Sequence, residues 1–184
     1  MIPRFESNVE QLSLNMIPTN ESGRPFKTLV YKGEEFEKLD DNDIKRLSEA
    51  LVKNDKYFGS IVLKKNNLSD LSALYLADAM KNFEGIRGLD LSKNNLSSRA
   101  GEYIGDALTP EYRIHFLSFR GNCLETFGLR RVLEAVNANE HIEMLDIGVI
   151  SNAGLEMVTD LLKSNTNLNK LRITECPDAP FEKA

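Results

Sequence analysis

Residues 86–96 read Ile86-Arg-Gly-Leu89-Asp-Leu91-Ser-Lys-Asn94-Asn-Leu96. Most of the chain consists of further copies of this segment, with a capping segment before them and a tail after them. Its apolar positions follow the spacing L-x-x-L-x-L-x-x-N-x-L, which is typical of a strand that turns a corner into a helix. The same spacing recurs 28 residues upstream and 28 residues downstream. Two further copies begin at Ile142 and Leu168. The sequence therefore predicts a tandem array of strand–turn–helix units.

The segments between these copies have helical periodicity. In residues 40–54, Ile44, Leu47 and Leu51 recur at intervals of three and four, and acidic residues stand where the helix N-terminus favours them. The later units keep the same register. One unit has too little material to bury both its strand face and its helix stripe, so we expect stacked neighbours to share one core.

Asparagine occupies the corner of three units, at Asn66, Asn94 and Asn122, and Cys176 holds this position in the last copy. We expect these side chains to form a structural ladder, because each amide can satisfy backbone groups of a buried turn. The fourth unit differs: Ile150 takes the asparagine position and the following helix arrives three residues early. The shortened turn leaves Val149 or Ile150 available at the rim, and it is either a neutral deletion or the mark of a contact site.

The 28-residue period, with a helix in each unit, resembles the ribonuclease-inhibitor-like class of leucine-rich repeats. The resemblance covers residues 26–176. It implies a right-handed α/β solenoid, with a parallel sheet on the concave side and helices on the convex side. Residues 1–25 are expected to be an extended capping segment with a strand near 9–14, and residues 177–184 a C-terminal tail.

Members of this class bind other proteins. The resemblance therefore implies a non-catalytic interaction scaffold, or a structural subunit of a larger intracellular assembly, with cytoskeletal and ciliary assemblies as candidates. The alternative that it leaves open is a regulator of a small GTPase, similar to a GTPase-activating protein.

Composition excludes several other classes. A hydrophobic content of 41%, a charged content of 28% and a net charge of −5 are those of an ordinary soluble protein and argue against a nucleic-acid partner. No apolar run approaches the roughly 20 residues that span a bilayer, and the N-terminus has no secretory signal pattern. We therefore expect a cytoplasmic protein without a membrane partner.

The sequence offers no catalytic, cofactor or metal site. The two cysteines, Cys123 and Cys176, form no C-x-x-C pair, and no nucleotide-binding, zinc-protease or hydrolase motif occurs. Asp90 and Asp146 fall at equivalent strand positions, but Ser118 stands between them. The two carboxylates would be roughly 10 Å apart, which is too far for a shared proton.

A candidate partner-binding surface follows from the side chains between the core positions of the strands. Phe116 and Met144 should be neighbours on the open side of the sheet. Cations and a histidine should surround them, which gives the full candidate set Lys64, Lys65, Arg87, Lys93, His115, Phe116, Arg120 and Met144. This pattern is typical either of a protein-binding hot spot with a basic rim or of a solvated charged face.

The C-terminal edge is the second place where a partner could bind. The last predicted strand, with Leu171 and Ile173, is followed by Thr-Glu-Cys-Pro-Asp-Ala-Pro-Phe-Glu-Lys-Ala and no helical pattern. Either this tail folds back with Phe181, or a partner covers the edge.

Overall fold

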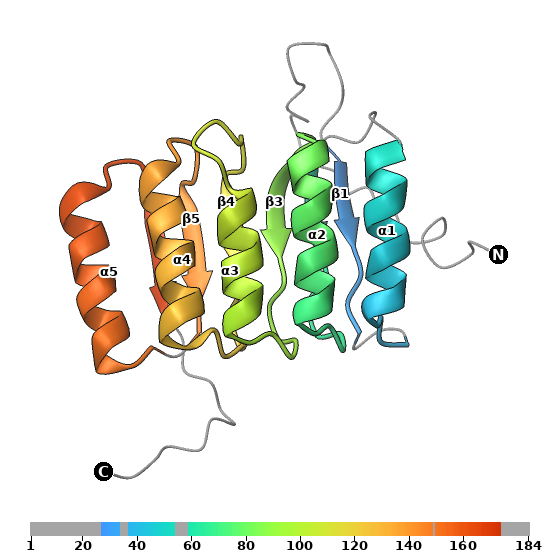
Figure 1. Ribbon diagram of the computed structural model, residues 1–184, viewed down its shortest axis with the longest axis horizontal. Helices are drawn as coiled ribbons and strands as arrows, with labels where there is room; N and C mark the ends of the chain where they lie inside the picture. Colours follow the sequence, from blue (N-terminus) through green and yellow to red (C-terminus); the bar gives the residue numbers. More distant parts are fainter. Residues whose placement is uncertain (1–26, 34–36, 54–58, 149, 174–184) are drawn as a thin grey trace, which may run out of the picture.

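The computed structural model describes residues 27–33, 37–53, 59–148 and 150–173, which form alternating strands and helices (Figure 1). In chain order the elements are β1 (Lys27–Val30), α1 (Asp41–Lys53), β2 (Gly59–Val62), α2 (Asp70–Asn82), β3 (Ile86–Asp90), α3 (Ser98–Ala107), β4 (Phe116–Ser118), α4 (Glu125–Ala138), β5 (Met144–Ile147), α5 (Asn152–Ser164) and β6 (Lys170–Ile173).

The six strands form one parallel sheet in the sequence order β1-β2-β3-β4-β5-β6. Each helix connects one strand to the next, and Figure 1 shows the five helices side by side in front of the sheet. The predicted α/β class and parallel sheet are confirmed. The predicted capping strand at residues 9–14, Cys176 and the tail 177–184 lie outside the described residues.

The shared core lies between the sheet and the helices. The middle position of five strands is occupied by Leu29, Ile61, Leu89, Leu117 and Leu145, which are paired in register. All of these except the partly buried Leu29 are fully buried. Helix residues at three- and four-residue intervals cover them, among them Leu76, Ile104 and Val132. The spacing of apolar residues therefore produces the packing of the whole array.

Asn66, Asn94 and Asn122 are buried at the corners and link each unit to the one before it. The Asn94 Oδ1 accepts a hydrogen bond from the Asn66 backbone N–H at 3.0 Å, and the Asn122 Oδ1 accepts from the Asn94 N–H at 3.2 Å. The Asn94 Nδ2 donates to the carbonyls of Leu63 and Leu91, which end two successive strands. Each side chain thus satisfies backbone groups that water cannot reach.

Helix starts are linked in a similar way. The Asp41 carboxylate, at the start of α1, accepts hydrogen bonds from the backbone N–H and hydroxyl of both Ser69 and Ser72 in the next unit. Asp70, at the start of α2, accepts from the N–H and hydroxyl of Ser97. Acidic residues at these positions therefore join neighbouring units, in addition to favouring the helix N-terminus.

The corner ladder ends at Asn122, because Ile150 follows in the next unit. The Asn122 N–H donates to the Phe119 carbonyl of its own turn at 3.1 Å. Ile150 is partly buried and packs against the core, where its Cβ would be 3.0 Å from a Cβ added at Gly154. The Ile150 side chain thus lies beside Gly154. That Val149 or Ile150 is available at the rim stays a prediction, because Ile150 is only partly buried and Val149 lies outside the described residues.

Candidate partner-binding face

The face of the sheet opposite the helices, here called the open face, carries two rows of side chains that alternate with the core positions. The first row runs Thr28, Ser60, Gly88, Phe116, Met144 and Lys170. The second row runs Val30, Val62, Asp90, Ser118, Asp146 and Arg172. The helices of the described chain all lie on the other side (Figure 1).

Phe116 and Met144 are direct neighbours across β4 and β5, as predicted from the repeat. Both side chains are partly exposed. On the far side of Phe116 stands Gly88, where an added Cβ would be 3.6 Å from the Phe116 Cβ and 2.5 Å from the Ser60 Oγ. The Ser60 side chain therefore occupies the space above Gly88, on the side of Phe116 away from Met144.

The predicted cations occupy three different environments. Lys64 and Arg120 follow β2 and β4 at equivalent positions, and Arg120 is exposed. Lys65 and Lys93 belong to the turns and have left-handed backbone, with φ of 60° and 56°. At the equivalent third position the turn has Gly121, with φ of 69°. Lys65 and Lys93 therefore lie at the corner, beyond the row that contains Phe116.

Arg87 differs from the other predicted cations. Its guanidinium donates to the carbonyl of Glu84 and, more weakly, to that of Ile86, and its side chain is partly buried. Burial lowers the pKa of Arg87, although the guanidinium remains charged near neutral pH. Arg87 is therefore held against its own turn instead of extending over the open face.

His115 precedes β4 and lies at one end of the strands. Its Nδ1 is 3.6 Å from the Glu143 Oε1, and its ring meets that of His141 edge to face, with centroids 6.5 Å apart. The His115 carbonyl also accepts from the N–H groups of Glu143 and Met144. The histidine is thus next to the Phe116–Met144 pair along the chain, within a polar group of its own.

Asp146 is the most unusual group on the open face. It is only 5% exposed, and its Oδ1 is buried without a hydrogen-bond partner among the described residues. Burial raises the pKa of Asp146, whereas the positive charges of Arg120 and Arg172 act in the opposite direction. Asp90, two strands away, raises it further. Carboxylates therefore interrupt the cations, so the face is mixed in charge and not a simple basic surface.

The predicted partner-binding set contains no residue of the second row. Val62 and Arg172 of this row also point to the open face, with Arg172 next to Asp146. The signal was available, because the fifth position of each copy must point the same way as the third. The strand ends, rather than the turns, carry this part of the surface.

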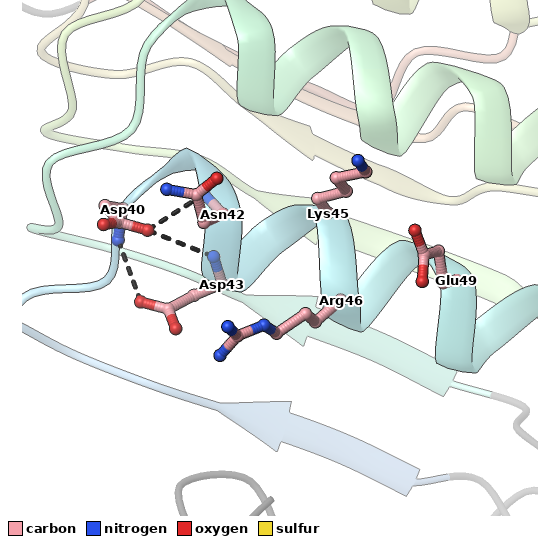
Figure 2. A pocket seen from close by; sticks show the side chains of 6 residues that line it. All are labelled: Asp40, Asn42, Asp43, Lys45, Arg46 and Glu49. Carbon is pink, nitrogen blue, oxygen red and sulfur yellow. Dashed lines mark hydrogen bonds between the residues drawn. The ribbon is translucent and has the colours of Figure 1, made fainter. Parts of the chain in front are cut away.

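A separate hollow of about 570 Å³ runs along α1 and is lined by Asp40, Asn42, Asp43, Lys45, Arg46 and Glu49 (Figure 2). At the start of α1, the Asp40 Oδ1 accepts from the Asp43 N–H at 3.1 Å and the Asp43 Oδ2 accepts from the Asp40 N–H at 3.2 Å. This reciprocal pair is a capping box, which explains the acidic cluster as the start of a helix. Lys45 turns towards the Tyr75 ring on α2, 6.0 Å away.

The described residues lack two kinds of feature. They contain no group of three or more histidine, cysteine or acidic side chains placed to hold a metal ion. None of the helices among them combines the length and apolar character needed to cross a bilayer.

Comparison with known proteins shows similarity of fold alone. No protein-family model matches the sequence, and no curated protein matches it. The structure is similar to that of leiomodin-1 actin-binding site 2, with a TM-score of 0.61 and 18% identity over 75% of this chain and 79% of that chain. It is also similar to the tropomodulin C-terminal domain of Caenorhabditis elegans, with a TM-score of 0.58 and 17% identity over 77% and 85% of the two chains. The chain thus has the leucine-rich-repeat-like α/β fold of these domains.

Proposed function

We propose that this chain is a non-catalytic protein-interaction scaffold, and that an acidic, partly apolar segment of another protein binds its open face. The domain that carries this function is residues 26–176, arranged as a right-handed solenoid of 28-residue repeats with the open face concave. The observation that carries the proposal is the Phe116–Met144 pair, partly exposed on a parallel sheet and flanked by Gly88 and Lys170.

Phe116 and Met144 would lose contact with water when a partner covers them, which favours binding. An aromatic and a methionine side chain at the centre of a patch are typical of interface hot spots. The positive charges of Lys64, Arg120 and Arg172 act on Asp146, two residues after Met144 on β5, and they favour a partner with carboxylates. Six strands at about 4.8 Å spacing give a surface roughly 25 Å wide, enough for an interface of standard size.

Actin is the first partner to test, because the leiomodin fragment with a similar fold is described as an actin-binding site. A cytoskeletal assembly therefore has support from fold similarity. The ciliary assignment and the GTPase-regulator alternative are not carried further, because nothing among the described residues favours either.

The test compares two double variants of the full chain in binding to fluorescently labelled monomeric actin. Phe116→Ala with Met144→Ala is expected to weaken binding at least tenfold, as truncation of a hot spot does. The matched control is Leu71→Ala with Phe127→Ala, which removes an exposed leucine and an exposed phenylalanine from α2 and α4. The control should bind as the unchanged chain does.

Two results would contradict the proposal. Equal binding by both double variants would refute the open face as the site. If actin does not bind, proteins captured from native extract by the unchanged chain and by the Phe116–Met144 variant are compared by mass spectrometry. An identical set of captured proteins would then overturn the role of this face for any partner.

A further inference from the structure

The outer edge of β6 has hydrogen-bonding groups aimed at a strand that is absent from the described residues. In four earlier units, the amide at the last core position donates to a carbonyl of the next strand: Tyr31 to Val62, Leu63 to Asp90, Leu91 to Ser118 and Phe119 to Asp146, at 2.8–2.9 Å. Ile173 holds this position in β6. It pairs with Ile147, and Ile147 corresponds to Phe119 because each comes one residue after the Ser118–Asp146 pair. Its N–H therefore points away from β5.

The apolar side chains at this end are also less covered than their counterparts. Ile173 is 43% exposed, whereas Phe119 and Ile147 at the same position are buried. On the terminal helix α5, Leu155 and Leu162 are 53% and 57% exposed and, seven residues apart, lie on the same side of the helix. Among the described residues, the apolar side chains of α5 and β6 are thus less covered than those of the earlier units.

The charges on β6 indicate what would cover it. Lys170 and Arg172 are exposed on the open face and alternate with Leu171 and Ile173, which face the helices. A strand added beside β6 would place its side chains in the same alternation. Its residues beside Leu171 and Ile173 should be apolar, and those beside Lys170 and Arg172 should be acidic.

We propose that β6 binds an extended segment of a partner protein, alternating apolar and acidic, as an additional strand of the sheet. Addition of a strand supplies backbone acceptors for the Ile173 amide and covers its side chain in one step. The proposal is independent of the Phe116–Met144 site, because it uses the edge of the sheet and not its face.

Two other occupants fit less well. In a symmetric pairing of two β6 strands from two copies of this chain, Lys170 and Arg172 of both copies would lie side by side on one face, and like charges would repel. The chain's own residues 174–184 contain Pro177 and Pro180. Proline has no N–H to donate, so this segment cannot form an uninterrupted ladder.

The probe is a short fluorescein-labelled peptide of alternating glutamate and valine, titrated with the full chain in an anisotropy assay. Arg172→Glu is expected to weaken binding about tenfold, because it replaces an attraction by a repulsion. Ile173→Pro removes the outward amide and the isoleucine side chain but no N–H that bonds to β5, so the ladder to β5 should survive while peptide binding is lost. Arg99→Glu, which reverses an exposed arginine on α3, is the matched control and should bind normally. Thermal melts establish that each variant is folded.

Each alternative gives a distinct result. The proposal is overturned if the full chain shows no saturable binding, or if Arg172→Glu and Ile173→Pro bind the peptide as tightly as the unchanged chain. It is also overturned if Phe116→Ala with Met144→Ala abolishes binding, which would place the peptide on the open face. Sedimentation that shows a dimer, lost on Ile173→Pro, would identify a second copy as the occupant. A peptide of alternating lysine and valine should not bind.

Discussion

Replacing Asn94 by alanine tests whether the corner ladder holds the array together. The Asn94 Oδ1 is the acceptor for the buried Asn66 N–H, and its Nδ2 donates to the carbonyls of Leu63 and Leu91. Each of these two carbonyls keeps one other donor, the Nδ2 of Asn66 and of Asn122 respectively. The Asn66 N–H keeps no acceptor, and the Leu68 N–H loses a longer hydrogen bond to the same Oδ1, at 3.4 Å, which adds little.

The expected loss of stability follows from the hydrogen bonds that the substitution removes. An orphaned buried amide costs about 2 kcal/mol, and the loss of one of two donors at each carbonyl adds about 0.5 kcal/mol. Asn94→Ala should therefore lower the free energy of unfolding by about 3 kcal/mol. The control is Asn95→Ala, one residue away, whose side chain is exposed and donates only to the exposed Asn67 side chain. It should change stability by less than about 0.5 kcal/mol.

Urea denaturation followed by circular dichroism measures both values, provided that the slope of free energy against denaturant is unchanged. A third variant, Asn94→Asp, keeps an acceptor for the Asn66 N–H. Its second carboxylate oxygen, however, replaces the Nδ2 donor and is repelled by the carbonyl oxygens of Leu63 and Leu91. Its stability should rise as the pH falls, because the protonated form can donate again. If Asn94→Ala is no more destabilising than Asn95→Ala, the ladder does not stabilise the fold and the reasoning fails.

Three further predictions concern other contacts. Gly128→Ala should destabilise the protein by about 2 kcal/mol despite the higher helix propensity of alanine, because the added Cβ on α4 would meet the Ser98 carbonyl on α3; a stabilised variant in thermal melts would contradict this. Although burial alone would raise the pKa of Asp41, the hydrogen bonds from Ser69 and Ser72 hold it below its usual value. The stability that they supply is present above pH 4 and lost as the pH falls through the lowered pKa, so Asp41→Asn should flatten the loss of stability in acid. Asp146 has a raised pKa, so its ionisation disfavours the folded state. Asp146→Asn should not lower the melting temperature at pH 7, and its advantage should shrink towards pH 4; a less stable variant at pH 7 would refute this.

The array of strands and helices could be predicted from the sequence, because each 28-residue interval contains both the apolar spacing of a strand and that of a helix. The strands begin within a residue or two of the predicted apolar triplets, and the pairing of Phe116 with Met144 follows from the interval alone. What the interval cannot show is the partner of each polar side chain. The bonds from Ser69 and Ser72 to Asp41 join different units, and residues 28 apart become neighbours only after stacking.

The open face was predicted less well for a similar reason. A position in the repeat says which way a side chain leaves the backbone but not where its end lies. Arg87 bends back to the Glu84 carbonyl, and Asp146 is covered although its row points away from the helices. Long or charged side chains choose among local partners, and those choices depend on neighbouring side chains that a one-dimensional pattern does not specify.

The direction of the asparagine ladder makes the array asymmetric along its length. Each corner depends on the asparagine of the following unit, so the ladder starts at Asn122 and supports the earlier units in turn. The segment from β5 to β6 is outside this chain of dependence. Amide exchange should therefore be fastest there, and the protein should unravel from its C-terminal end while the first four units still protect one another.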